Sequence, residues 1–140
     1  KLKFDTDIII KNIEKLPFYK KISENGFCLH ISQTQINKST INANLLVRKV
    51  FKNSNLIDYS LIKPGEKRMI PCRIYLKNQI LLTKVSFFIP KRRSSISPEP
   101  RFWPYKLGKY VESGTQLFFI VRTQNNSSFL EIYDHEPSIL

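Results

Sequence analysis

Cationic side chains gather in one proline-rich segment, residues 90–105, which contains a single acidic residue, Glu99. Its lysine and arginines are Lys91, Arg92, Arg93 and Arg101. An arginine fork can bind a phosphate group or the edge of a guanine, and a lysine neutralises phosphate. Each of the prolines in the segment fixes its own φ and restricts the residue before it. The segment therefore predicts a stiffened cationic loop that binds a polyanion.

A second segment, residues 32–44, is rich in amides and hydroxyls and contains one charged side chain, Lys38. Asparagine and glutamine can bond both N6 and N7 of adenine, while serine and threonine bond bases and phosphates. The candidate DNA contacts in it are Gln33, Gln35, Asn37, Lys38, Ser39, Thr40, Asn42 and Asn44. The alternative is a solvated loop whose residues 37–40 cap a helix over residues 45–51.

The chain carries a net charge of +12, and its cations are concentrated rather than evenly spread. Such an imbalance favours an acidic partner, nucleic acid before an anionic membrane surface. No apolar run reaches membrane-spanning length, and the basic residues lie on a loop rather than on an amphipathic helix. We therefore expect a nucleic-acid partner, no membrane association and a cytoplasmic location.

Residues that could perform catalysis or bind a metal are scattered along the chain. His30, His135, Cys28 and Cys72 do not have the spacing of zinc ligands, and we expect both cysteines to be buried free thiols. The acids form no Asp…Glu-x-Lys run, and neither histidine has a His-x-Lys context. Because known nucleases use such groups, we expect no catalysis, no metal and no cofactor in these 140 residues.

Short apolar runs between turn signals make up most of the chain, and several short strands with one or two short helices predict a barrel or half-open barrel. The predicted strands cover residues 27–32, 67–76, 79–89, 116–122 and 129–133, with Lys77–Asn78 at the tip of a hairpin. The predicted helical segments cover residues 9–16 and 107–115. We divide the chain into a helical or linker extension, residues 1–25, and one β domain, residues 26–140.

Residues 94–111 resemble a known signature, Ser-Glu-(Pro/Tyr)-Arg plus aromatics followed by a short Leu-x-Lys-Tyr segment. It belongs to DNA-recognition domains of restriction endonucleases: the EcoRII effector-binding domain and the C-terminal domain of the BfiI and NgoAVII type. These share the pseudobarrel of plant B-three transcription-factor domains. Upstream, Ile31-Ser32, a polar loop and residues 41–47 are similar to the first arm of that family. The family's Asp-Thr-Gly and His-Gln are replaced by residues 35–40, so base preference is not carried across.

The resemblance implies a mainly β, seven-stranded open pseudobarrel that holds the major groove of DNA between two arms. The first arm is residues 32–44 and the second arm is residues 91–105. In the second arm it implies guanine or phosphate contacts by arginines, an acid that accepts from cytosine or holds Arg101, and aromatics that brace the arm. The residues in question are Lys91, Arg92, Arg93, Ser94, Ser95, Glu99, Arg101, Trp103 and Tyr105. Phosphate neutralisation is expected from Lys38, Lys84, Lys91, Lys106 and Lys109.

The favoured function is sequence-specific binding of double-stranded DNA, as the target-recognition or effector-binding module of a type II restriction endonuclease. Its nuclease domain would lie elsewhere in the parent protein. The alternative is an RNA or single-stranded nucleic-acid binder, which needs aromatics displayed for base stacking. Candidates for that display are Tyr75, Phe87, Trp103 and Tyr105. A further alternative is an enzyme with a pocket that the sequence does not reveal.

Overall fold

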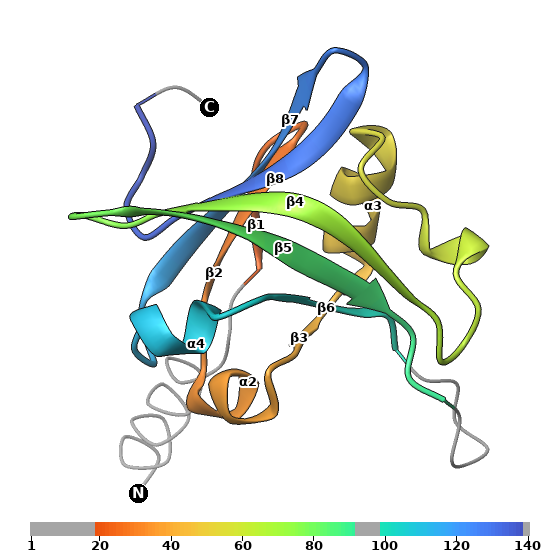
Figure 1. Ribbon diagram of the computed structural model, residues 1–140, viewed down its shortest axis with the longest axis horizontal. Helices are drawn as coiled ribbons and strands as arrows, with labels where there is room; N and C mark the ends of the chain where they lie inside the picture. Colours follow the sequence, from red (N-terminus) through yellow and green to blue (C-terminus); the bar gives the residue numbers. More distant parts are fainter. Residues whose placement is uncertain (1–18, 92–98, 139–140) are drawn as a thin grey trace, which may run out of the picture.

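The computed structural model describes residues 19–91 and 99–138, which form one strongly curled, half-barrel sheet with three short α-helices (Figure 1). The strands are β1 (Lys20–Ser23), β2 (Gly26–His30), β3 (Ile41–Asn42), β4 (Lys67–Tyr75), β5 (Ile80–Phe88), β6 (Arg101–Pro104), β7 (Gln116–Gln124) and β8 (Ser127–Tyr133). The helices are α2 (Gln33–Lys38), α3 (Leu45–Asn53) and α4 (Leu107–Tyr110), with a 3₁₀ turn η1 (Tyr59–Leu61). The prediction of a mainly β, half-open barrel is confirmed, but the described residues form eight strands and not seven.

The strands follow the order β1-β2-β7-β8-β4-β5-β6-β3, so β1 and β3 are the two edges of the sheet. Neighbours are antiparallel except β4 and β8, which run parallel. The sequence did not predict β1. This strand lies within residues 1–25, which were expected to form a helical or linker extension, and it pairs with β2. The helix expected over residues 9–16 lies outside the described residues.

The core is built from side chains that alternate along the strands and from the buried face of α3. Phe27 of β2 stacks on Phe119 of β7 with ring centroids 4.9 Å apart. Phe51 of α3 makes edge contacts with Phe87 and Phe102 at 5.4 and 5.3 Å. All five rings are fully buried. This aromatic cluster anchors α3 to the inner face of β5, β6 and β7.

Two helices begin at capping residues in the first arm. Ser32 and Gln35 form a capping box at the start of α2, in a segment that the sequence predicted as a loop. The predicted helix over residues 45–51 exists as α3, but its cap is Asn44 and not residues 37–40. The first arm is therefore a helix followed by a short edge strand, which fixes the direction of its side chains.

Turn chemistry accounts for the hairpins. The tip at Lys77–Asn78 is confirmed, since Leu76 N–H donates to the carbonyl of Gln79 at 2.9 Å. The turn between β7 and β8 consists of Asn125 and Asn126, both with positive φ, as a type I′ hairpin turn requires. The prediction that residues 90–105 form a loop throughout is wrong for β6, which pairs with β5 and β3.

Both cysteines are buried free thiols, as predicted. Burial raises the pKa of the Cys72 thiol, with a smaller contribution from the charge of Glu131. Cys28 lies beside Phe118 on the outer face of β2 and β7, where both side chains are buried. Among the described residues, we find no helix with the length and apolar character needed to cross a membrane.

Candidate nucleic-acid interface

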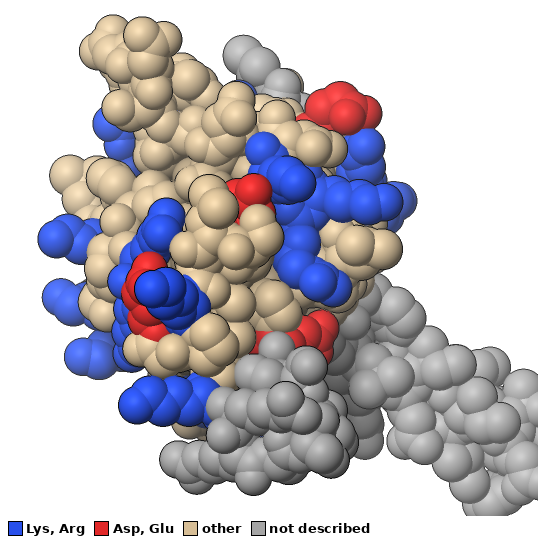
Figure 2. Space-filling view, turned by 90° about the vertical axis from the view of Figure 1, so that its right-hand side faces the viewer, with Lys and Arg blue, Asp and Glu red and all other residues tan. Residues whose placement is uncertain are grey.

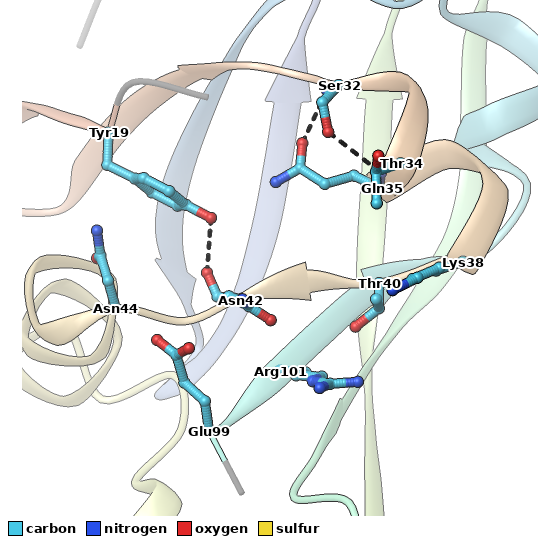
Figure 3. A pocket seen from close by; sticks show the side chains of 10 residues that line it. All are labelled: Tyr19, Ser32, Thr34, Gln35, Lys38, Thr40, Asn42, Asn44, Glu99 and Arg101. Atoms are coloured by element: carbon cyan, nitrogen blue, oxygen red, sulfur yellow. Dashed lines mark hydrogen bonds between the residues drawn. The ribbon is translucent and has the colours of Figure 1, made fainter. Parts of the chain in front are cut away.

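The two predicted arms meet around one cavity of about 480 Å³, which we call the inter-arm cavity (Figure 3). It is lined by Tyr19, Ser32, Thr34, Gln35, Lys38, Thr40, Asn42, Asn44, Glu99 and Arg101. The lining consists of amides, hydroxyls, two cations, one carboxylate and one aromatic ring. Such a set can donate and accept hydrogen bonds in several directions, as a ligand with several polar edges requires.

The start of α2 positions the first group of lining residues. Ser32 Oγ accepts from Gln35 N–H at 3.2 Å, and Gln35 Oε1 accepts from Ser32 N–H at 2.9 Å. These two bonds hold Gln35 in place, and the residue is 9% exposed. On the outer surface of α2, Gln33 Nε2 donates to Asn37 Oδ1 at 2.8 Å. Of the amide side chains of α2, Gln35 is therefore recessed, whereas Gln33 and Asn37 are exposed.

The pairing of β3 with β6 brings the two arms together. Asn42 lies opposite Arg101, and Ala43 N–H donates to the Pro100 carbonyl at 2.8 Å. The alternate pair, Ile41 and Phe102, is fully buried in the core. Because side chains alternate along a strand, Asn42 and Arg101 face away from the core, and both line the inter-arm cavity.

Tyr19, immediately before β1, completes the cavity wall. Its hydroxyl donates to the backbone carbonyl of Asn42 at 2.9 Å, which joins the two edges of the sheet (Figure 3). Burial, with a smaller contribution from the negative charge of Glu99, raises the pKa of Tyr19 to about 12. The hydroxyl therefore stays protonated well above neutral pH and keeps its hydrogen bond to the Asn42 carbonyl.

Two polar atoms at the cavity are buried and find no hydrogen-bond partner among the described residues. They are Thr40 Oγ1 and Arg101 Nε. Buried polar atoms are nearly always paired, so these two side chains have a hydrogen-bonding capacity that rotation towards the cavity could satisfy with a ligand or water. Arg101 is held from the other side, since Tyr59 donates its hydroxyl to the Arg101 carbonyl at 2.9 Å.

The remaining predicted site residues fall into different environments. Trp103 is 7% exposed and lies near Ile36 of α2, so its ring is placed to support the first arm. Tyr105 is exposed, and its hydroxyl bonds Met69 Sδ at 3.6 Å. Lys91 is exposed and lies beside Gly65. Glu99 was one candidate for holding Arg101, but the ion pairs of the described residues include none between these two. Arg92, Arg93, Ser94 and Ser95 lie outside the described residues.

Sequence reasoning missed three lining residues: Tyr19, Ser32 and Thr34. Ser32 and Thr34 lie within the first arm, and the pattern Ser32-x-x-Gln35 is itself a capping-box signal. No local signal marks Tyr19, because only the curling of the sheet brings its edge strand to Asn42. Sequence reasoning did not indicate that Gln35 is buried; Trp103, which the resemblance implies braces the arm, is buried as well.

Cations lie on α3 and β1, close to the cavity. Figure 2 looks onto the side of the molecule that carries α3, where Lys and Arg form several groups with Asp and Glu among them. We call this set the α3 patch; it comprises Lys20, Lys21, Arg48, Lys49 and Lys52. Asn44, which caps α3, lines the inter-arm cavity, and Lys21 and Lys49 line one shallow groove between β1 and α3. The patch contains one ion pair, Lys21 with Glu24 at 3.0 Å.

The aromatic residues proposed for single-strand stacking are mostly not displayed. Phe87 is fully buried and Trp103 is 7% exposed. Tyr75 stacks on Tyr133 with centroids 4.6 Å apart, and its hydroxyl donates to the buried Glu131 at 2.9 Å. Of these four residues, only Tyr105 is exposed. These four residues therefore do not form the row of open aromatic faces that this alternative requires.

Residues 19–91 and 99–138 hold no group of three or more His, Cys, Asp or Glu side chains close enough to bind one metal ion. Comparison with known proteins finds no matching family model, no similar curated protein and no similar solved structure. The functional argument therefore rests on the cavity, its two arms and the surrounding charge.

Proposed function

We propose that this domain binds double-stranded DNA in a sequence-specific manner, as the target-recognition or effector-binding module of a type II restriction endonuclease. In this proposal β2 to β8 correspond to the seven strands of a B-three-like pseudobarrel, and β1 is an additional edge strand. The nuclease chemistry belongs to another domain of the parent protein, the 140 residues perform no catalysis alone, and the protein acts in the cytoplasm.

One observation carries the proposal. Residues 32–44 and residues 99–101 are far apart in the sequence, yet they line a single polar cavity. Exposed polar side chains beside it, such as Asn37 and Lys38, suit the donor and acceptor pattern of the major groove. The first arm and the described part of the second arm thus supply base contacts from one side of the domain, as a two-armed reader requires.

The charge distribution supports the same partner. Affinity for duplex DNA comes largely from cations that neutralise phosphates and release counterions. The α3 patch lies next to the cavity, with Lys49 and Lys52 exposed on α3. A duplex read by the arms then has its backbone within reach of these lysines, and phosphate contacts would set the orientation of the protein on the DNA.

The test is selection from a randomised duplex pool, followed by binding of the selected duplex in competition with its single strands and with RNA of the same sequence. We expect a short enriched motif and preference for the duplex. Asn37→Ala in the first arm and Arg93→Ala in the second should each cost about 1–3 kcal/mol and relax the motif at one position. Lys77→Ala, at the far hairpin tip, is the control.

Binding without an enriched motif would overturn the specific-reader proposal, leaving a basic domain that grips phosphate. Stronger binding of the single strand or of RNA would replace it with the alternative of a single-strand binder. Cleavage of plasmid by the isolated 140 residues would show that the domain is itself an enzyme.

A further inference from the structure

The polar residues of the first arm differ in what they can reach. A side chain that reads a stacked base pair must extend into the groove, because the base edges lie at its floor. Gln33 and Asn37 are exposed and can do so. Gln35 is 9% exposed and is held inside the arm by the capping box. A group can contact Gln35 only by entering the inter-arm cavity.

Two polar atoms that lack hydrogen-bond partners in the described part of the chain are recessed in the same way as Gln35. Thr40 Oγ1 and Arg101 Nε are buried, and among the described residues neither has a hydrogen-bond partner. Both residues line the inter-arm cavity (Figure 3). An intact duplex held against the surface cannot place a base edge at these recessed atoms. A group inside the cavity lies next to both residues, and rotation of either side chain would bring its unpaired atom into contact with that group.

We propose that the inter-arm cavity holds one nucleotide of the bound duplex, with its base rotated out of the helical stack. The inference rests on the proposed DNA binding and adds a mode of recognition: exposed residues of the arms read neighbouring pairs in the groove, and recessed residues read the extruded base. Proteins that extrude a base bind its pairing edge through hydrogen bonds and its faces through aromatic or apolar contacts.

The size and lining of the cavity fit a nucleotide. Its volume of about 480 Å³ lies within the range of pockets that enclose drug-sized ligands. Asn44 Oδ1 is occupied by Val47 N–H at 3.0 Å, and its amide nitrogen remains as a donor on the cavity wall. Glu99 supplies acceptors, Lys38 a charge for the phosphate, and the ring of Tyr19 an aromatic surface.

The experiment places 2-aminopurine, which is quenched when stacked, at each position of the selected motif in turn. We expect a several-fold rise in fluorescence at one position when the full 140-residue chain binds. At that position a mismatched partner base should strengthen binding by about tenfold, because unpairing is then already achieved. If the protein instead reads every base pair in the groove, a mismatch within the motif should weaken binding.

Two variants connect the signal to this cavity. Thr40→Val replaces the unpaired hydroxyl with a methyl group of similar shape, and Asn42→Ala removes an exposed side chain whose backbone carbonyl still accepts from Tyr19. Both should reduce the fluorescence rise and the mismatch preference at least severalfold, with thermal melting used to confirm folding. Asn37→Ala is the matched control: it does not line the cavity, so it should weaken binding and retain the rise.

Three results would overturn the inference. Motif-specific duplex binding with no fluorescence rise at any position would refute base extrusion and leave the proposed function intact. A rise that persists in both Thr40→Val and Asn42→Ala would show that the base is held elsewhere. Failure of the chain to bind any duplex would refute the proposed function itself, which distinguishes the two failures.

Discussion

Replacement of two lysines of the α3 patch tests whether DNA backbone runs along this helix. Lys49 and Lys52 are exposed, and neither takes part in the ion pairs found among the described residues. Lys21 is excluded because it pairs with Glu24, and Arg48 because its Nε is buried. The double variant Lys49→Gln/Lys52→Gln therefore removes two cations that form no close ion pair among the described residues, although Lys52 contributes weakly to lowering the pKa of Asp58.

The expected magnitude follows from counterion release. Each neutralised phosphate contributes about 0.9 to the slope of log affinity against log salt concentration, so the double variant should lose about 1.8. Between about 50 and about 200 mM salt, the affinity of the unaltered protein should then fall roughly tenfold further than that of the variant. Fluorescence anisotropy of a labelled duplex at four or more salt concentrations gives both slopes.

The matched control is Lys77→Glu, which changes the net charge by the same amount at the distant hairpin between β4 and β5. Its slope should remain within error of the unaltered protein, because screening at about 0.1 M salt restricts charge effects to about 10 Å. Equal slopes for the double variant and the unaltered protein would refute the backbone contact. An equal loss in Lys77→Glu would show that only net charge matters.

Three further substitutions test the fold and the cavity wall. Phe51→Ala removes the ring that joins α3 to the sheet and should lower the free energy of unfolding by about 3–5 kcal/mol in urea; a loss below about 1 kcal/mol would refute its role as an anchor. Ser32→Ala removes the hydroxyl that accepts from Gln35 N–H and should cost about 1 kcal/mol, whereas Ser32→Asp, which can still cap, should recover most of it; equal losses would argue against capping. Tyr19→Phe removes the bond to Asn42 and should cost about 1 kcal/mol at pH 7, measured by thermal melting. The raised pKa of Tyr19 means that the folded state keeps the phenol protonated where the unfolded chain ionises, so its stabilising effect is complete below pH 10 and falls as the pH rises towards 12. Tyr19→Phe should therefore flatten the loss of stability between these values, and an unchanged profile would contradict the assignment.

The longer strands could be predicted because each contains its own signal. β4 and β5 flank a tight hairpin and alternate in exposure on the side nearest to it, and β7 and β8 are rich in aromatic and β-branched residues. Turn residues such as Asn125 and Asn126 mark where these strands reverse. In such cases local sequence and tertiary packing favour the same structure.

The short elements around the site contain weaker signals. α2 has one apolar residue, Ile36, so it has no helical stripe to recognise, although its capping box is visible in the sequence. β3 has two residues and β6 four; β3 forms by pairing with β6, and β6 pairs with β5 as well. Strands of this length cannot be identified from alternation, since their pairing is entirely non-local.

The types of residue at the candidate site could be predicted from the sequence, but the degree to which each side chain is buried could not. Composition identified both arms, and the structure places residues of each around one cavity. Whether a given amide is exposed like Gln33 or recessed like Gln35 depends on the rotation of a six-residue helix against its neighbours. That rotation depends on the capping box and on the packing of Ile36 against the core, where Ile36 and Trp103 both lie close to Gly108.

The position of the cavity follows from the incomplete closure of the sheet. β1 and β3 are the edges, and an edge strand exposes backbone groups that other strands would otherwise pair. Tyr19 satisfies one such group by donating to the carbonyl of Asn42, but a single side chain joins the edges without filling the space between them. The polar cavity is that space, with Thr40 and Arg101 in its wall. A half-open barrel thus provides a recess for a ligand without disturbing the aromatic core that holds its walls in place.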